Sequence, residues 1–182
     1  MAPTDGSSTS VGPGVERAFL AHWRSLPRDG LIPSLPAFLD RPHPGFAPWL
    51  NIVDFISETE MPVRYFGTRL VESFGEITRL NFPDFLKKDV RPLVARGHRM
   101  VCETPCGWTT LSRAITTSGR EIVAETITLP LMRGGRPSSP VKLTNVIEHL
   151  NFKESLVTVD QVTSQHWIDL GAGVPNESDL PS

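Results

Sequence analysis

The sequence predicts an α+β domain with an antiparallel sheet, because helix-like and strand-like segments are grouped along the chain by type. Two strand-like runs come first, helical segments follow, and three further strand-like runs complete a core between residues 48 and 152. This grouping favours antiparallel pairing, whereas a parallel sheet needs strands and helices in alternation. The 182 residues are 39% hydrophobic with a net charge of -2, which is typical of one globular domain.

The N-terminal part divides into a polar tail, a helix and a connector. Residues 1–14 are rich in Gly, Ser, Thr and Pro, so we expect a disordered tail. Residues 15–47 are expected to hold a flanking helix followed by a proline-rich connector with one helical turn near residues 34–39. The helix is predicted by an apolar stripe at helical spacing, formed by Val15, Phe19 and Trp23.

Two strands are expected at the start of the core, followed by helices. The dense apolar run 49–56 predicts a buried strand, and residues 63–70 predict its hairpin partner. Residues 70–86 are interrupted by glycine and proline, which favours short helical turns. Residues 87–103 predict a longer helix with Pro92 in its first turn.

The core is expected to end with three strands. Residues 108–117 and 121–132 predict two strands joined at Ser118-Gly119, and residues 141–150 predict the last one. The remaining residues, 153–182, predict a partly disordered tail with a short helix near residues 164–170.

A series of short motifs spans the core in a fixed order. They are His22-Trp23, Gly30 to Pro33, Pro48 to Leu50, Val53-Asp54, Arg64 to Thr68, Glu72, Gly75 to Thr78, and Leu129 to Leu131. With the order of elements, they resemble the PAS superfamily, and in particular a bacterial family of short, stand-alone PAS-like proteins. The chain departs from that pattern at Arg79, where the family has glycine after the threonine.

The resemblance implies a fold and a class of function. It implies a five-stranded antiparallel sheet with short helices on one face and an N-terminal flanking helix. Many PAS domains dimerise through such a helix, which makes the stripe at residues 15–23 a candidate homodimer contact. PAS domains often hold a small ligand between sheet and helices. Fold alone does not settle function.

The pocket candidates come from the last strand and from aromatic residues. Alternation puts Leu143, Asn145 and Ile147 on one strand face and Lys142 on the other. If the first face points inward, Asn145 needs a partner, which a ligand, a strand or a helix could supply. Aromatic residues could line the pocket or simply pack in the core. The predicted lining is Trp49, Phe66, Trp108, Leu143, Asn145 and Ile147.

His98 and Cys102, four residues apart on the long helix, are the candidates for haem or a metal. A histidine on the corresponding helix carries haem in some PAS oxygen sensors. Arg96 and Arg99 flank His98, and the apolar stripe passes beside it, so a surface histidine is expected. Neither Cys102 nor Cys106 has the sequence context of flavin-photosensing PAS domains, so a flavin is not expected.

The sequence contains no nucleophile elbow, phosphate-binding glycine loop or His-Glu-x-x-His motif. We therefore expect a non-enzymatic cytoplasmic regulatory module that binds a small ligand or a protein partner and acts in trans. The alternatives are a dimeric scaffold with a self-filled pocket, and a haem or metal sensor. Scattered basic residues argue against nucleic-acid binding, and the lack of a long apolar run argues against a membrane partner.

Overall fold

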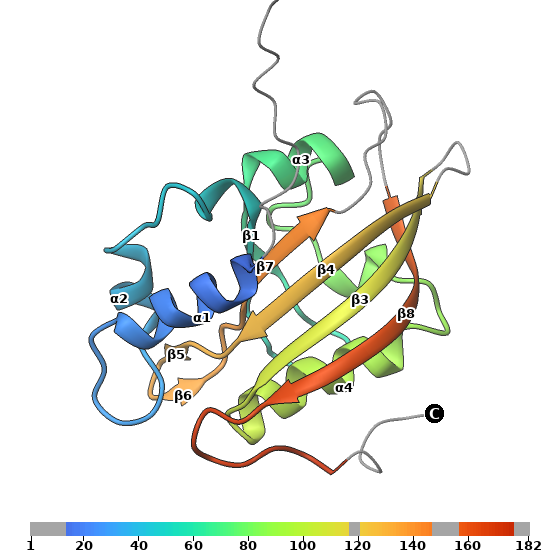
Figure 1. Cartoon of the computed structure of the whole chain (residues 1–182). Helices are drawn as coiled ribbons and strands as arrows, with labels where there is room; N and C mark the ends of the chain where they lie inside the picture. Colours follow the sequence, from blue (N-terminus) through green and yellow to red (C-terminus); the bar gives the residue numbers. More distant parts are fainter. Residues whose placement is uncertain (1–13, 117–120, 147–156, 177–182) are drawn as a thin grey trace, which may run out of the picture.

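The computed structural model describes residues 14–116, 121–146 and 157–176 (Figure 1). Its main feature is a six-stranded sheet in the order β2-β1-β7-β4-β3-β8, in which all neighbouring strands are antiparallel. The predicted α+β class, antiparallel sheet and PAS-like succession of elements are confirmed. The sheet has six strands where five were expected.

The elements follow the predicted order along the chain. The helices are α1 (Val15–Ser25), α2 (Leu35–Leu39), α3 (Thr68–Phe74) and α4 (Arg91–Glu103), with short 3-10 turns η1 (Ala47–Trp49) and η2 (Phe82–Phe85). The strands of the main sheet are β1 (Leu50–Val53), β2 (Val63–Phe66), β3 (Gly107–Thr116), β4 (Glu121–Leu129), β7 (Val141–Val146) and β8 (Val157–Ile168). A small hairpin pairs β5 (Met132–Arg133) with β6 (Arg136–Pro137).

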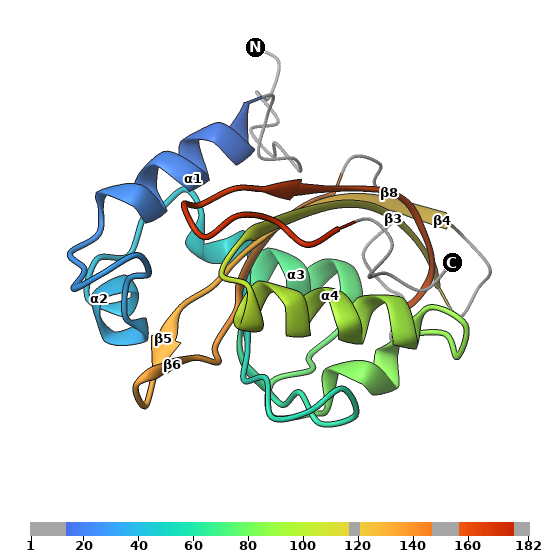
Figure 2. The same cartoon turned by 90° about the horizontal axis from the view of Figure 1, so that it is seen from below.

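Both faces of the sheet are covered. Figure 2 shows α1 on one side of the sheet, and α3 and α4 on the other side, where the strands arch over them. Helices therefore lie on both sides of the sheet, whereas the resemblance implied short helices on one face. This difference decides which residues of β7 face the candidate site.

The sixth strand replaces an expected tail. The short helix predicted near residues 164–170 is wrong, because β8 pairs with β3 from Thr116 to Gly107. Valine and threonine are frequent in β8, and both favour the pleated conformation. Trp167 stacks on Trp108 with ring centroids 5.7 Å apart, so the C-terminal segment contributes to the core.

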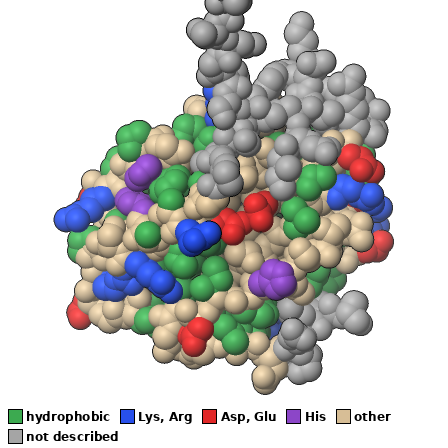
Figure 3. Space-filling model, viewed as in Figure 1, with side chains coloured by type: hydrophobic (Ala, Val, Ile, Leu, Met, Phe, Trp, Pro, Cys, Tyr) green, Lys and Arg blue, Asp and Glu red, His purple; other side chains and the backbone are tan. Residues whose placement is uncertain are grey.

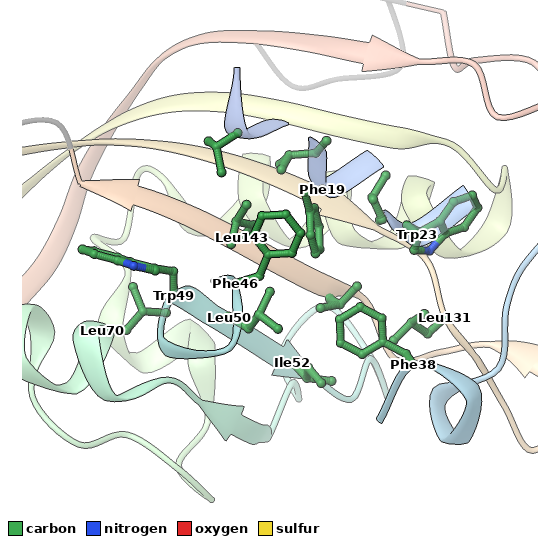
Figure 4. Close-up of a cluster of buried hydrophobic side chains, with 14 of the residues drawn as sticks. Phe19, Trp23, Phe38, Phe46, Trp49, Leu50, Ile52, Leu70, Leu131 and Leu143 are labelled. Atoms are coloured by element: carbon green, nitrogen blue, oxygen red, sulfur yellow. The ribbon is translucent and has the colours of Figure 1, made fainter. Parts of the chain in front are cut away.

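The apolar stripe of α1 packs against its own chain. Phe19 and Trp23 are almost fully buried, and Figure 4 shows both within a cluster that includes Phe46. The Trp23 indole Nε1 donates to the carbonyl oxygen of Pro130 at 3.0 Å, and Val15 is also buried. The stripe is therefore not free for the dimer contact that its sequence suggested. The homodimer itself stays a prediction.

The strand ends differ from the predictions for local reasons. The strand expected over residues 63–70 ends at Phe66, because Gly67 begins the turn into α3. Trp49 belongs to η1 instead of the first strand. Ser34 caps α2 by accepting a hydrogen bond from the Ala37 amide at 3.2 Å. The Ser118-Gly119 turn and residues 147–150 lie outside the described residues.

Arg79 occupies the position where the resembled family has glycine. Its φ of 70° lies in the left-handed region. Glycine adopts this region at little cost, whereas a residue with a Cβ is strained there. The Arg79 amide nevertheless donates to the Val63 carbonyl oxygen at 2.8 Å. The loop therefore keeps the glycine-type conformation despite the substitution.

The surface carries charges of both signs. On the face shown in Figure 3, acidic and basic side chains are interspersed with small hydrophobic groups. The large exposed hydrophobic residues come from separate segments; they are Leu31, Leu39, Ile56, Tyr65, Leu80 and Val174. Among the described residues, no helix combines the length and apolar character needed to cross a bilayer.

Candidate ligand-binding cavity

A cavity of about 110 Å³ lies between the arched face of the sheet and the segment from α3 to α4. Its walls are mainly apolar; they include Phe66, Leu70, Phe74, Phe82, Leu86 and Trp108. The sheet contributes a polar floor, formed by Asn51, Thr110, Thr126, Thr128, Lys142 and Thr144. For comparison, an engineered apolar cavity of about 150 Å³ binds benzene. The space suits a molecule with roughly one small ring.

The strand register brings the polar floor together. Asn51 pairs with Lys142, Lys142 with Thr128, and Thr128 with Trp108, so these four residues form one row across β1, β7, β4 and β3. Directly opposite residues in antiparallel strands have Cβ atoms about 4.5–5.5 Å apart. All four line the cavity, so an amide, an ammonium and a hydroxyl lie side by side there.

Lys142 is the unusual member of this row. Its side chain is only 4% exposed, and its Nζ lies 3.4 Å from the centroid of the Phe82 ring. Within the described residues, the ammonium has neither a carboxylate nor a hydrogen-bond acceptor as its partner. Burial lowers the pKa of Lys142 from 10.5 to about 7. A buried unpaired cation costs folding free energy, so the position needs an explanation beyond stability.

His98 faces the row from α4. Its Nδ1 lies 2.8 Å from the carbonyl oxygen of Val94; because a carbonyl oxygen only accepts, Nδ1 carries the hydrogen and Nε2 carries the lone pair. Nε2 is buried without a partner among the described atoms. Burial, reinforced by the nearby charge of Lys142, lowers the pKa of His98 to about 3. His98 is therefore a neutral ring with one free acceptor.

The expectation of a surface histidine was wrong, because His98 is 1% exposed. The side of α4 that carries His98 faces the sheet. The helix meets the sheet closely at Gly97, where a Cβ would lie 2.3 Å from the Trp108 ring. Because α4 and the sheet approach each other closely at Gly97, His98 and Cys102 are buried, while Leu93 and Met100 stay partly exposed.

Asn51 is a further residue of the cavity lining with an unpartnered side-chain atom. It is 3% exposed within the fully buried strand β1. Its Oδ1 has no hydrogen-bond partner among the described residues. Nearly all buried polar groups in proteins have a partner, so an orphaned amide oxygen beside an orphaned ammonium is an exception that points to a ligand.

The predicted pocket residues are divided by the structure. Phe66 and Trp108 line the cavity. Trp49 and Leu143 lie outside the lining, in the hydrophobic cluster of Figure 4, where Leu143 is near Phe46 and Trp49 is near Leu70. Asn145 is partly buried and outside the lining, and Ile147 lies outside the described residues. The face of β7 was assigned the wrong way round, because α1 covers the side that carries Leu143.

His98, Cys102 and Cys106 do not form a metal site in the structure. The described ranges contain no group of three or more His, Cys, Asp and Glu side chains that could hold a metal ion. Cys102 and Cys106 are buried thiols outside the cavity lining, and burial raises the pKa of both to about 12. Both thiols are therefore protonated at neutral pH, and neither lines the cavity.

A haem does not fit the cavity as it stands. The orientation of His98 would suit a metal ligand, because metal-bound histidines usually donate their other N–H to a carbonyl or carboxylate. The ring of Phe82 lies 5.7 Å and the ring of Trp108 5.8 Å from the imidazole, centroid to centroid. A haem macrocycle is several times larger than the 110 Å³ beside these rings.

A second cavity, of about 200 Å³, lies on the other side of the sheet. Its lining includes His22, His43 and Tyr65. None of the buried unpartnered side-chain atoms found in the described ranges belongs to this lining. Because unpartnered polar atoms line the smaller cavity and not this one, the smaller cavity is the better candidate for the ligand-binding site.

Three residues of the site were missed from the sequence: Asn51, Thr128 and Lys142. A usable signal was present, because Asn51 interrupts an apolar run and threonine recurs at every second position at residues 126 and 128. Alternate polar residues on strands that are buried on both faces indicate a polar cavity floor.

No protein-family model and no curated protein sequence matches this chain. Among solved structures, the "Structure of an RNA-binding Light-Oxygen-Voltage Receptor" aligns with 20% sequence identity and a TM-score of 0.45, over 67% of this chain and 35% of that chain. The chain thus spans about a third of the length of that receptor. The order of elements, and the sheet that arches over the short helices, agree with the PAS-like architecture expected from the sequence.

Proposed function

We propose that the chain is a PAS-type regulatory module that binds a small molecule in the cavity between the sheet and the α3–α4 segment. One observation carries the proposal: Asn51, His98 and Lys142 line this cavity, and in the described protein Asn51 Oδ1 and His98 Nε2 have no hydrogen-bond partner, while the charge of Lys142 meets the Phe82 ring and no carboxylate. A ligand would supply those partners. The regulatory role, and the protein partner that would respond to binding, follow from the PAS resemblance alone.

The chemistry of the lining supports binding in preference to catalysis. Its titratable side chains are His98 and Lys142. The Ser112 hydroxyl, which also lines the cavity, donates to the Ala124 carbonyl oxygen at 3.3 Å, so no base activates it. Hydrolytic acyl transfer needs a nucleophile hydrogen-bonded to a base, and the described lining pairs no such groups.

Filling the cavity should abolish small-molecule binding. Ala124 is buried and lines the cavity from β4, so Ala124→Leu places three further carbons in it. We expect phenol, a neutral one-ring probe, to shift the NMR resonances of lining residues such as Thr128 and Trp108 in the wild type. In Ala124→Leu those shifts should be lost, because the ring and the leucine cannot share the space.

The matched control is Ala18→Leu, which adds the same atoms to an exposed position on α1. This variant should bind phenol like the wild type. A dispersed spectrum of unbound Ala124→Leu shows that the variant is folded. Equal phenol shifts at the cavity in the wild type and in folded Ala124→Leu would refute the proposal, as would shifts confined to the His22 and His43 cavity.

A further inference from the structure

We infer that the ligand of this cavity is a small carboxylic acid with an apolar body and a hydroxyl or N–H donor. Its carboxylate pairs with Lys142, and its donor bonds to His98 Nε2 or Asn51 Oδ1. The inference rests on the proposed function and names the chemical class of the ligand.

The carboxylate follows from the surroundings of Lys142. Among the described residues, the Nζ atom contacts the face of the Phe82 ring at 3.4 Å from its centroid, and aromatic faces neutralise only a small part of a cation's charge. The neighbours in its row, Asn51 and Thr128, are uncharged. A ligand that brings one negative charge would give this buried ammonium the charge-assisted hydrogen bond that the protein does not provide.

The donor follows from the two free acceptors. His98 Nε2 bears a lone pair because Nδ1 donates to Val94, and Asn51 Oδ1 is an acceptor by its nature. Both atoms are buried and unpartnered in the described chain. A pure hydrocarbon acid would leave them unsatisfied, which costs free energy. A hydroxyl or N–H group on the ligand removes that cost for the acceptor to which it donates.

The apolar body follows from the walls and the size. Phe66, Phe74, Phe82, Leu86 and Trp108 face the cavity of about 110 Å³. This volume accepts one small ring or a short branched chain, by comparison with the benzene-sized cavity of about 150 Å³. A ring would lie against aromatic walls while its polar groups meet the sheet floor.

A phosphate or sulfate fits this lining less well. Lys142 is the sole cation of the described lining, whereas sites for doubly charged anions usually combine arginine with several backbone N–H donors. The free atoms of His98 and Asn51 are acceptors, so they would repel a second negative charge. One negative charge matches the single ammonium, and one donor satisfies one of the two free acceptors.

Calorimetric titration of the full chain at pH 6 tests this class of ligand. The probes are 2-, 3- and 4-hydroxybenzoate, each compared with the hydroxybenzamide of the same substitution pattern, which has the same shape without the charge. We expect at least one hydroxybenzoate to bind about tenfold or more tightly than its amide. In Lys142→Met that preference should disappear while binding of the amide remains.

Three further variants complete the test. Either His98→Leu or Asn51→Leu should keep the preference for carboxylate over amide but lose the advantage of hydroxybenzoate over benzoate, because the acceptor of the ligand's hydroxyl is gone. Lys88→Met removes an exposed lysine and should change neither. Equal affinity for acid and amide in the wild type, or an acid affinity unchanged in Lys142→Met, would overturn the inference.

The test also separates this inference from the proposed function. If phenol shifts the lining resonances but no hydroxybenzoate binds at millimolar concentration, the ligand class is wrong and small-molecule binding stands. If neither phenol nor any hydroxybenzoate binds, both the proposed function and the proposed ligand class are wrong.

Discussion

Replacing Lys142 by methionine is expected to stabilise the folded protein at neutral pH, although it removes the central polar group of the cavity. Methionine is close to lysine in length and flexibility, keeps the contact with Phe82, and has no charge to desolvate. Burial lowers the pKa of Lys142 from 10.5 to about 7. Each pKa unit corresponds to about 1.4 kcal/mol, so the expected gain is on the order of a few kcal/mol.

The pH dependence of this gain has a definite sign. Between pH 7 and 10.5 the unfolded chain protonates this lysine more than the folded chain does. The contribution of Lys142 to the free energy of unfolding therefore falls as pH drops from about 10.5 to 7, and stays low below that. The difference between Lys142→Met and the wild type should be largest at pH 7 or below and shrink toward pH 10.

Chemical denaturation of both proteins across this pH range measures the effect. Lys88→Met is the control, because Lys88 is exposed and its loss should change stability by at most about 0.5 kcal/mol at any pH. If Lys142→Met is less stable than the wild type at pH 7, the ammonium has a stabilising partner, and the unpaired-cation interpretation is wrong.

Gly67→Ala is expected to have the opposite effect, a loss of about 2–3 kcal/mol or more. Gly67 begins α3, and its amide donates to the Leu50 carbonyl oxygen at 2.8 Å. A Cβ at this position would lie 2.3 Å from the carbonyl oxygen of Pro48 and 2.6 Å from that of Ala47. Both are backbone atoms, so η1 must move away from the junction of β2 and α3, which strains the core.

The matched control is Gly45→Ala, where the nearest atom to a new Cβ is a His43 side-chain carbon at 3.3 Å. That side chain is exposed and can give way, so we expect a change within about 0.5 kcal/mol. Thermal unfolding of both variants gives the comparison. Equal melting temperatures for Gly67→Ala and Gly45→Ala would show that the close approach at Gly67 is not needed for the fold.

Local sequence patterns predicted the helices and strands well, but they did not predict what packs against each of them. The apolar stripe Val15, Phe19 and Trp23 predicted a helix, and α1 confirms it. The same stripe could not show what covers it, because a helix face looks identical whether it packs on a second chain or on its own sheet. The choice depends on contacts such as that between Trp23 and Pro130, which are 107 residues apart.

The candidate site was hard to predict for the same reason. Alternation on β7 correctly separated Leu143 from Lys142, but it does not say which face meets the cavity. Once both faces are covered, hydrophobicity no longer distinguishes inside from outside. A lysine in a strand is ordinarily exposed, so only the register with Asn51 and Thr128 reveals that Lys142 lies on the cavity floor.

The C-terminal strand shows how a missed element affects a site. Val159 and Val162 of β8 line the cavity, and Gln165 accepts a hydrogen bond from the Trp108 indole at 3.1 Å. A five-stranded sheet without β8 would leave this side of the cavity open. The sixth strand thus closes one wall and fixes the orientation of Trp108.

At the centre of this account is the contact between the buried ammonium of Lys142 and the carboxylate of a small ligand. A crystal structure with the tightest-binding hydroxybenzoate tests this contact most directly. We expect a carboxylate oxygen about 2.8 Å from Lys142 Nζ, the ring against Phe82 and Trp108, and the hydroxyl directed at His98 or Asn51. A ligand bound on the α1 side of the sheet, or one in the cavity with its carboxylate turned away from Lys142, would contradict the account.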